Sequence, residues 1–109
     1  MREVVMMPDD GRHVRPLQIG AATFGGGDGS SVEEAITIGG IADNTKGVAA
    51  EYDYLQKLLG PRGVRWNVRQ QRLMARDNRY FDVLTVMLPD GAQREFFFDI
   101  TEFFGKIGG

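Results

Sequence analysis

The chain contains no cysteine and only one histidine, His13, among its 109 residues. The lack of cysteine excludes disulfides, thiolate metal sites and cysteine nucleophiles, and it is compatible with a reducing compartment. A lone histidine cannot supply a pair of imidazole ligands, and no serine stands in the pattern that a catalytic histidine would activate. We therefore expect no catalytic residue, no metal ion and no cofactor, and we interpret His13 as an exposed residue near a turn.

Long hydrophobic runs are also absent. The apolar stretch near the start of the chain is too short for a signal peptide, and no later stretch approaches the length of a membrane span. A chain of 109 residues suits one domain with a core large enough to fold without disulfides. We expect one soluble, cytoplasmic domain over residues 1–109, with no membrane partner.

The spacing of the apolar residues predicts an α+β fold. From Asn44 or Thr45 as N-cap, apolar side chains fall at helical spacing until Gly60-Pro61, which predicts an amphipathic helix over about 45–59. The residues that define this spacing are Val48, Ala49, Tyr52, Leu55, Leu58 and Leu59. The segments after the helix alternate between apolar and polar residues, which is typical of an antiparallel β-meander. Its three strands are expected at about 64–74, 79–88 and 92–100.

Shorter elements are expected at both ends of the chain. The turn residues Pro8–Gly11 predict a short N-terminal hairpin between Val4–Met7 and the segment Val14–Phe24. Thr101 can cap a short C-terminal helix that ends at Gly105 and brings Phe103 or Phe104 back onto the sheet.

Residues 25–31 are rich in glycine and offer little side chain to bury, which predicts a flexible loop. The loop lacks the lysine of a P-loop and does not match the dinucleotide-binding glycine pattern, so we expect no nucleotide site. The following residues, 31–39, give conflicting signals. Ser31 and Glu34 fit a capping box at the start of a helix, whereas Ile36-Thr37-Ile38 favours a strand, and both alternatives remain open.

Turn residues set the expected register of the meander. We interpret Asp90-Gly91 and Asp77-Asn78 as the centres of two-residue hairpin turns. The expected pairs are Val83 with Phe98, Phe81 with Ile100, Met74 with Phe81, and Val68 with Met87. The face toward the helix then carries Trp66, Val68, Met74, Phe81, Val83, Met87, Phe96, Phe98 and Ile100.

Residues 61–79 hold six arginines and one acidic residue. Arginine matches the planar geometry of carboxylate and phosphate groups better than lysine does. Strand alternation places Arg65 and Arg69 on the face away from the expected core. This face can bind an acidic protein or the phosphates of a nucleic acid, or its arginines can be neutralised by acidic residues such as Glu95 across the sheet.

The same register places Asp82 directly opposite Asp99. Like charges in this position repel each other unless solvent, an arginine or a metal ion intervenes. We interpret them as compensated by arginine or exposed to solvent, with binding of Mg²⁺ or Ca²⁺ as the alternative. Apolar residues on this second face form an exposed patch for a partner if nothing covers them. They are Leu84, Val86, Leu88 and Phe97.

These observations favour a non-enzymatic protein-binding module, such as a small inhibitor, immunity-type or adaptor protein from a bacterium or phage. The partner is expected to be a protein or a second copy of the chain. One alternative is binding of RNA or another polyanion through the arginine-lined strand, and another is a metal-dependent hydrolase or nuclease using Asp82 and Asp99. The expected binding residues are Arg65, Arg69, Asp82, Phe97 and Asp99.

Overall fold

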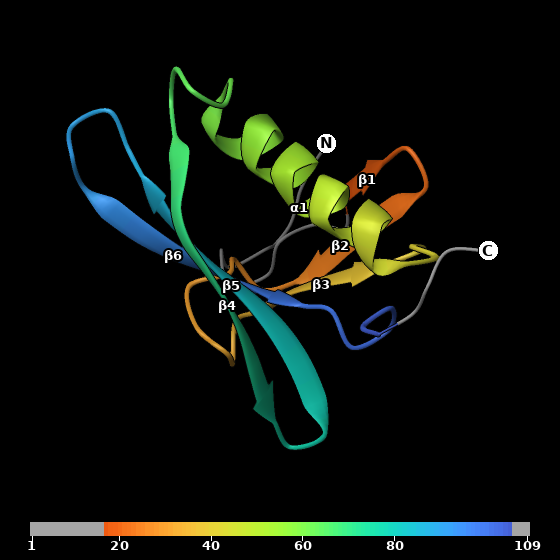
Figure 1. The fold of residues 1–109 in the computed structure, drawn as a ribbon. Helices are drawn as coiled ribbons and strands as arrows, with labels where there is room; N and C mark the ends of the chain where they lie inside the picture. Colours follow the sequence, from red (N-terminus) through yellow and green to blue (C-terminus); the bar gives the residue numbers. More distant parts are fainter. Residues whose placement is uncertain (1–16, 106–109) are drawn as a thin grey trace, which may run out of the picture.

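The structure is a computed structural model that describes residues 17–105. Its elements in chain order are β1 (Leu17–Ile19), β2 (Ala22–Gly26), β3 (Ile36–Gly39), α1 (Asn44–Leu59), β4 (Asn67–Arg76), β5 (Arg79–Met87) and β6 (Gln93–Asp99). The strands form one six-stranded sheet, and α1 crosses one of its faces (Figure 1). The expected α+β class is therefore confirmed.

The sheet has the strand order β1-β2-β3-β6-β5-β4. Neighbouring strands are antiparallel except for β3 and β6, which are parallel. A parallel pair requires a long connection between its strands, and here that connection contains α1 and the β4–β5 hairpin. The meander is thus one half of a larger sheet, and β4 forms the edge of that half.

Helix α1 agrees with the predicted range to within one residue. Its N-cap is Asp43, whose carboxylate accepts a hydrogen bond of 2.9 Å from the backbone N–H of Lys46. The helix ends at Gly60, where φ is 105°, in a region that residues with a Cβ avoid. Asp43 therefore takes the capping role that the sequence suggested for Asn44 or Thr45.

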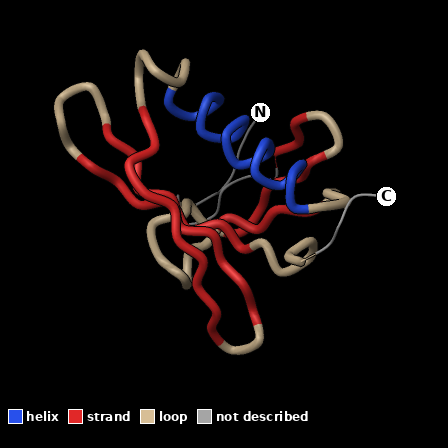
Figure 2. The backbone as a smooth tube through the Cα atoms, viewed as in Figure 1, coloured by secondary structure: helices blue, strands red, loops and turns tan. Residues whose placement is uncertain are grey.

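The sheet has a hydrophobic core on each face. The larger core lies beneath α1, and its fully buried aromatic residues include Phe24, Trp66, Phe96, Phe98 and Phe103. The smaller core consists of Ala35, Phe81, Val83 and Phe97, with Val32 and Met74 packed against it. The segment between β2 and β3 covers this second face, on the side of the sheet opposite α1 (Figure 2).

The register of the β4–β5 hairpin is confirmed near its turn. Asp77 and Asn78 both have positive φ, at 53° and 63°, as a two-residue hairpin turn requires. Met74 lies opposite Phe81 as predicted. Further along, a bulge between Val68 and Gln70 shifts the pairing, so Val68 lies opposite Val86 and not Met87.

The predicted register of the β5–β6 hairpin is wrong by one residue. The loop is Pro89-Asp90-Gly91, since the N–H of Leu88 donates to the carbonyl of Ala92 over 2.8 Å and Gly91 has a φ of 88°. The observed pairs are Phe81 with Asp99, Asp82 with Phe98, Val83 with Phe97, and Leu84 with Phe96. Because side chains alternate between the two faces of a sheet, this slip places each β5 side chain on the face opposite to the one predicted from its β6 partner.

The predicted helix-facing wall is therefore correct only in part. Phe96, Phe98 and Ile100 lie beneath α1 with Trp66, but their neighbours from β5 are Leu84 and Val86. Val68 also packs against the larger core, whereas three other members predicted for this wall belong to the second core, namely Met74, Phe81 and Val83.

The ends of the described segment also differ from expectation. Residues 101–105 form turns and not a helix, and the N–H groups of Phe103 and Phe104 both donate to the carbonyl of Ile100. Phe103 nevertheless folds back into the core, where it is 2% exposed. The first strand of the predicted N-terminal hairpin and its turn lie outside the described residues. The segment predicted as a single strand over Val14–Phe24 includes β1 and β2, which are separated by a turn at Gly20, where φ is 60°.

The glycine-rich run is not a loop throughout, because Gly25 and Gly26 belong to β2. Gly27 lies so close to Glu34 that an added Cβ would meet the Glu34 carbonyl oxygen at 2.4 Å. The open question over residues 31–39 is answered by β3, which is a strand. The flexibility of the loop stays a prediction. Within residues 17–105, no helix is long and apolar enough to cross a membrane.

Candidate functional site

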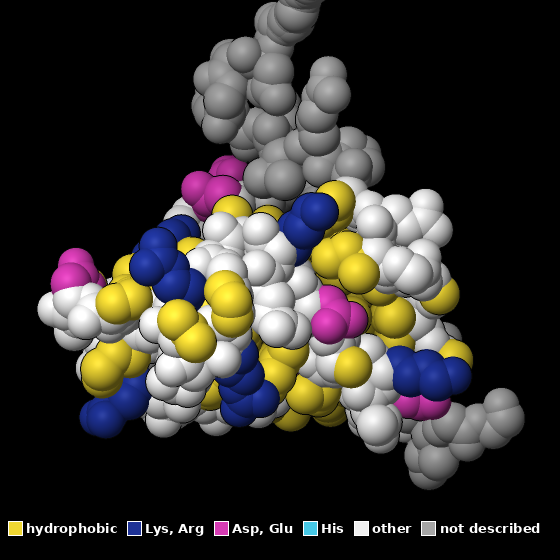
Figure 3. All heavy atoms as spheres, turned by 90° about the horizontal axis from the view of Figure 1, so that it is seen from above, with side chains coloured by type: hydrophobic (Ala, Val, Ile, Leu, Met, Phe, Trp, Pro, Cys, Tyr) yellow, Lys and Arg dark blue, Asp and Glu magenta, His cyan; other side chains and the backbone are white. Residues whose placement is uncertain are grey.

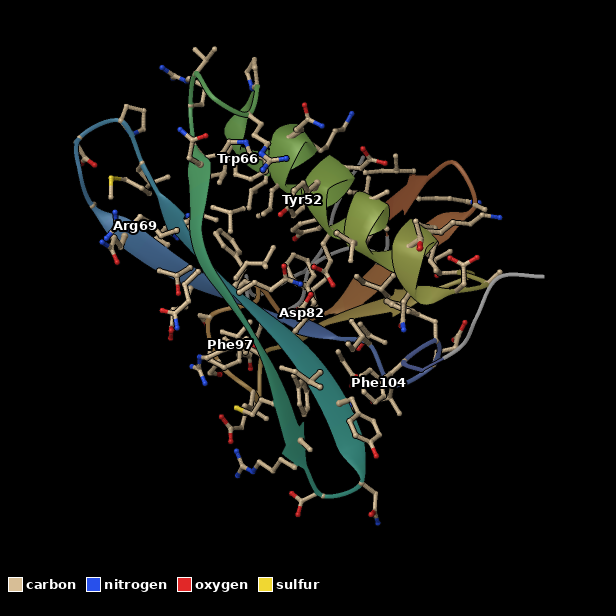
Figure 4. All side chains as sticks on the ribbon, in the orientation of Figure 1. Tyr52, Trp66, Arg69, Asp82, Phe97 and Phe104 are labelled. Atoms are coloured by element: carbon tan, nitrogen blue, oxygen red, sulfur yellow. The ribbon has the colours of Figure 1, made fainter. Side chains whose placement is uncertain are left out.

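The predicted binding residues do not form one site. Asp82 is buried on the side of the sheet that α1 covers, whereas Phe97 is buried on the opposite side (Figure 4). Asp99 is buried on the same side as Phe97, since it lies opposite Phe81 of the second core. Arg65 lies just before the edge strand β4 and Arg69 lies within it, and both are exposed.

The predicted pair of Asp82 and Asp99 does not exist. Asp82 lies opposite Phe98 and Asp99 opposite Phe81, so the two carboxylates are on different faces. Asp99 accepts hydrogen bonds from Arg79 Nη2, from the Thr101 backbone N–H at 3.0 Å and from the Thr101 hydroxyl at 2.6 Å. It serves to join the start of β5 to the end of β6. Among residues 17–105, no group of three or more His, Cys, Asp or Glu side chains could hold a metal ion.

The exposed apolar patch, which was predicted only if nothing covers its residues, does not form because they are covered. Leu84 and Val86 are fully buried beneath α1, and Leu88 is packed against the same core. Phe97 is 9% exposed because the segment between β2 and β3 covers it. The backbone N–H of Phe97 donates to the carbonyl of Gly29 over 2.8 Å, which holds this segment against β6.

The arginines of the meander are divided between paired and unpaired groups. Arg72 lies 3.4 Å from Glu95, and Arg76 lies 3.1 Å from Glu33, with all these side chains about half exposed or more. Within the described residues, Arg65 and Arg69 have no ion pair. Arg69 is the extra residue at the bulge of β4, and it points away from α1 and Trp66 (Figure 4). Figure 3 shows acidic, basic and hydrophobic side chains interspersed on the upper face, without one dominant charged region.

A cluster of polar side chains that the sequence did not predict lies beneath α1. It consists of Glu51 from the helix, Asp82 from β5 and Gln71 from β4. Glu51 is 1% exposed and Asp82 is 5% exposed. Gln71 Nε2 donates to Asp82 Oδ2 over 2.8 Å, whereas Glu51 Oε1 is buried without a hydrogen-bond partner.

Burial raises the pKa of Glu51 to about 10, with further contributions from a hydrogen bond to Asp82 and from the negative charge of Asp82. Glu51 is therefore protonated at neutral pH and donates its proton to the Asp82 carboxylate. The protonated Glu51 carboxyl and the Asp82 side chain are thus buried side by side beneath α1.

Glu51 escaped the sequence reasoning because the predicted apolar stripe of the helix was rotated. Val48 and Leu58 are 38% and 51% exposed, although both belonged to that stripe. The buried residues are Gly47, Ala50, Glu51, Tyr54 and Leu55. These positions also recur at helical spacing. A second stripe, which includes one acidic residue, was therefore the signal in the sequence that could have indicated the burial of Glu51.

A pocket of about 210 Å³ opens over this cluster between α1, β4 and the turn after β6. Its lining residues are Asn44, Val48, Glu51, Gln71, Arg72, Leu73, Asp82, Ile100, Phe103 and Phe104. A wider hollow of about 760 Å³ lies on the other face, next to Arg76 and Arg79. Both arginines of that hollow are already paired, Arg76 with Glu33 and Arg79 with Asp99.

Comparison of the chain with protein-family models, with curated proteins and with solved structures finds no match. The function has to be inferred from the chemistry of its own residues.

Proposed function

We propose that the protein is a non-enzymatic protein-binding module in which the edge strand β4 pairs with an extended, acidic segment of a partner protein. The observation that carries this proposal is the combination of a long, exposed edge strand with a row of arginines. Asp82, Phe97 and Asp99 are buried and take no part in this surface.

The edge of the sheet supports pairing with another chain. β4 has 10 residues and is the last strand of the sheet, so one side of its backbone has no neighbouring strand within the described residues. Such unpaired N–H and C=O groups are a template for an added strand. The opposite edge, β1, has only 3 residues and offers much less backbone. The bulge at Arg69 interrupts β4, which leaves Gln70–Arg76 as the regular stretch for pairing.

The charge of the edge favours an acidic partner. Arg65 and Arg69 have no acidic neighbour in the described part of the chain, so a carboxylate from a partner would meet them without displacing an existing ion pair. The ion pairs of Arg72 and Arg76 are exposed, and exposed pairs contribute little to stability. They can therefore be exchanged for carboxylates of a partner at small cost. Guanidinium groups bind carboxylates with two parallel hydrogen bonds, which adds specificity.

A synthetic peptide of alternating glutamate and valine tests the proposal, because valine favours the extended conformation and glutamate supplies the charge. We expect the peptide to shift the backbone NMR signals of Gln70–Arg76. We also expect Arg69→Glu to weaken binding several-fold more than Lys57→Glu, which makes the same charge change at an exposed residue of α1.

Two results would contradict the proposal. One is that the peptide shifts signals elsewhere and leaves those of β4 unchanged. The other is that oligouridylate of equal length binds more tightly than the peptide and loses affinity steeply with added salt. That second result would support the alternative of RNA or polyanion binding through the same arginines.

A further inference from the structure

The buried acid on α1 has an unused hydrogen-bonding atom. Glu51 is 1% exposed, and its Oε1 atom has no partner within the described residues. A buried acceptor without a donor destabilises the fold, and the few such groups in native proteins require an explanation. Glu51 also lines the pocket between α1 and β4, so a molecule in that pocket lies next to this side chain.

The pocket combines an acidic floor with apolar walls. Glu51 and Asp82 form the floor, and Val48, Leu73 and Phe104 are among the walls. Phe104 is fixed by stacking on Tyr80, with ring centroids 4.3 Å apart. Asp82 and Phe104 lie on the same side of β5 (Figure 4). A volume of about 210 Å³ is below the range of drug-sized ligands, so it suits one small group.

The charges around the pocket favour a cation. Among the lining residues, the ionisable groups are Glu51 from α1, Asp82 from β5 and Arg72 from β4. Arg72 directs its guanidinium toward Glu95, 3.4 Å away, and it faces the same side of the sheet as its cross-strand partner Val83 in the second core. No positively charged group of the described residues therefore neutralises the two acids.

We propose that this pocket binds a small organic cation, namely a primary amine that carries a short aliphatic or aromatic group. The ammonium lies between Glu51 and Asp82 and donates to Glu51 Oε1. Its remaining donors are available to Asp82, and the apolar group of the ligand contacts Val48, Leu73 and Phe104. The site uses the helix side of the sheet, whereas the proposed protein interface uses the outer edge of β4.

Binding of the amine is coupled to the loss of a proton. Glu51 is protonated at neutral pH, because burial and Asp82 raise its pKa to about 10. When a protonated amine enters, the Glu51 carboxyl releases its proton to the buffer and becomes the counter-ion of the ammonium. Each bound cation therefore releases close to one proton.

Benzylamine is a suitable probe, with benzyl alcohol as a neutral ligand of the same shape. We expect saturable binding of benzylamine at one site, seen as shifts in the NMR signals of Gln71 and Asp82. Calorimetry in buffers of different ionisation enthalpy should give close to one proton released per ligand. We expect Glu51→Gln to weaken binding at least tenfold, and Val48→Phe to weaken it by narrowing the pocket mouth without changing either acid. Asp53→Asn, at an exposed residue of the same helix, is the control and should leave binding unchanged.

The proposal is overturned if benzylamine does not saturate the site at millimolar concentration, or if benzyl alcohol binds equally well. It is also overturned if Glu51→Gln binds as the wild type does. If benzylamine does not bind and a buried water molecule is found hydrogen-bonded to Glu51 Oε1, that water explains the unpartnered oxygen and replaces the proposal.

Discussion

Replacing Glu51 with glutamine should make the protein more stable at neutral and alkaline pH. Glutamine has nearly the shape of a protonated glutamic acid, and its amide N–H can donate to the Asp82 carboxylate in the same way. It differs in that it has no proton to lose. The substitution therefore removes a titration while preserving the packing beneath α1.

The size of the effect follows from the pKa of Glu51 in the two states. That pKa is about 10 in the folded protein and 4.5 as the ordinary value for glutamate. Between these values the folded protein holds one more proton than the unfolded chain, so the free energy of unfolding decreases as pH rises, by at most about 1.4 kcal/mol per pH unit. Below the lower value Glu51 is protonated in both states, and its penalty on the free energy of unfolding vanishes. At pH 7 it amounts to about 3 kcal/mol, which is the largest gain that Glu51→Gln can give at that pH.

Urea unfolding at intervals from pH 5 to pH 8 measures this effect. The wild type should lose stability steadily across the range relative to Glu51→Gln, and the two proteins should converge toward pH 5. Asp53→Asn is the matched control, since it removes an exposed carboxylate from the same helix and should keep the pH dependence of the wild type. Equal pH dependence in wild type and Glu51→Gln, or a less stable Glu51→Gln protein at pH 8, would refute the reasoning.

Two further substitutions test the packing around the site. Gly47→Ala would ordinarily stabilise a helix, but here the added Cβ would meet Phe103 Cε1 at 2.0 Å, so we expect a loss of about 1–3 kcal/mol in urea unfolding. A gain in stability would show that Phe103 can move aside easily. Asp99→Ala leaves the backbone N–H of Thr101 without its acceptor and should cost about 2 kcal/mol, measured in the same way. Unchanged stability would show that Asp99 does not hold the end of β6 to β5.

Local signals predicted the parts of the fold that local interactions decide. The helix followed from apolar spacing and from Gly60-Pro61, and the β4–β5 register near its turn followed from Asp77-Asn78. The pairing of β3 with β6 was not predictable in this way, since it joins segments separated by α1 and a hairpin. Nothing in either strand alone specifies that partner. The meander was therefore found, but its place in a six-stranded sheet was not.

The length of a single turn decided most of the errors about the site. Asp90-Gly91 is compatible with a two-residue turn and also with the last two positions of a three-residue loop. The structure has the second arrangement, which moves β6 by one residue relative to β5. That slip separates Asp82 from Asp99 and moves Leu84 beneath the helix. One ambiguous turn thus produced a false carboxylate pair and most of a false apolar patch, whose remaining member, Phe97, is covered by the segment between β2 and β3.

The orientation of α1 contradicts the simplest count of its hydrophobic residues. Turning the helix so that Val48, Ala49 and Tyr52 face the sheet would place Glu51 nearer to solvent, yet these three side chains remain at least partly exposed and the acid is buried. Burying an acid that must be kept protonated opposes folding at neutral pH. Proteins depart from their local preferences mainly at functional or strained positions. The departure at Glu51 coincides with a pocket, a second acid and an unpartnered oxygen, and this coincidence makes the helix side of the sheet, and not the face predicted from the sequence, the place to look for a ligand.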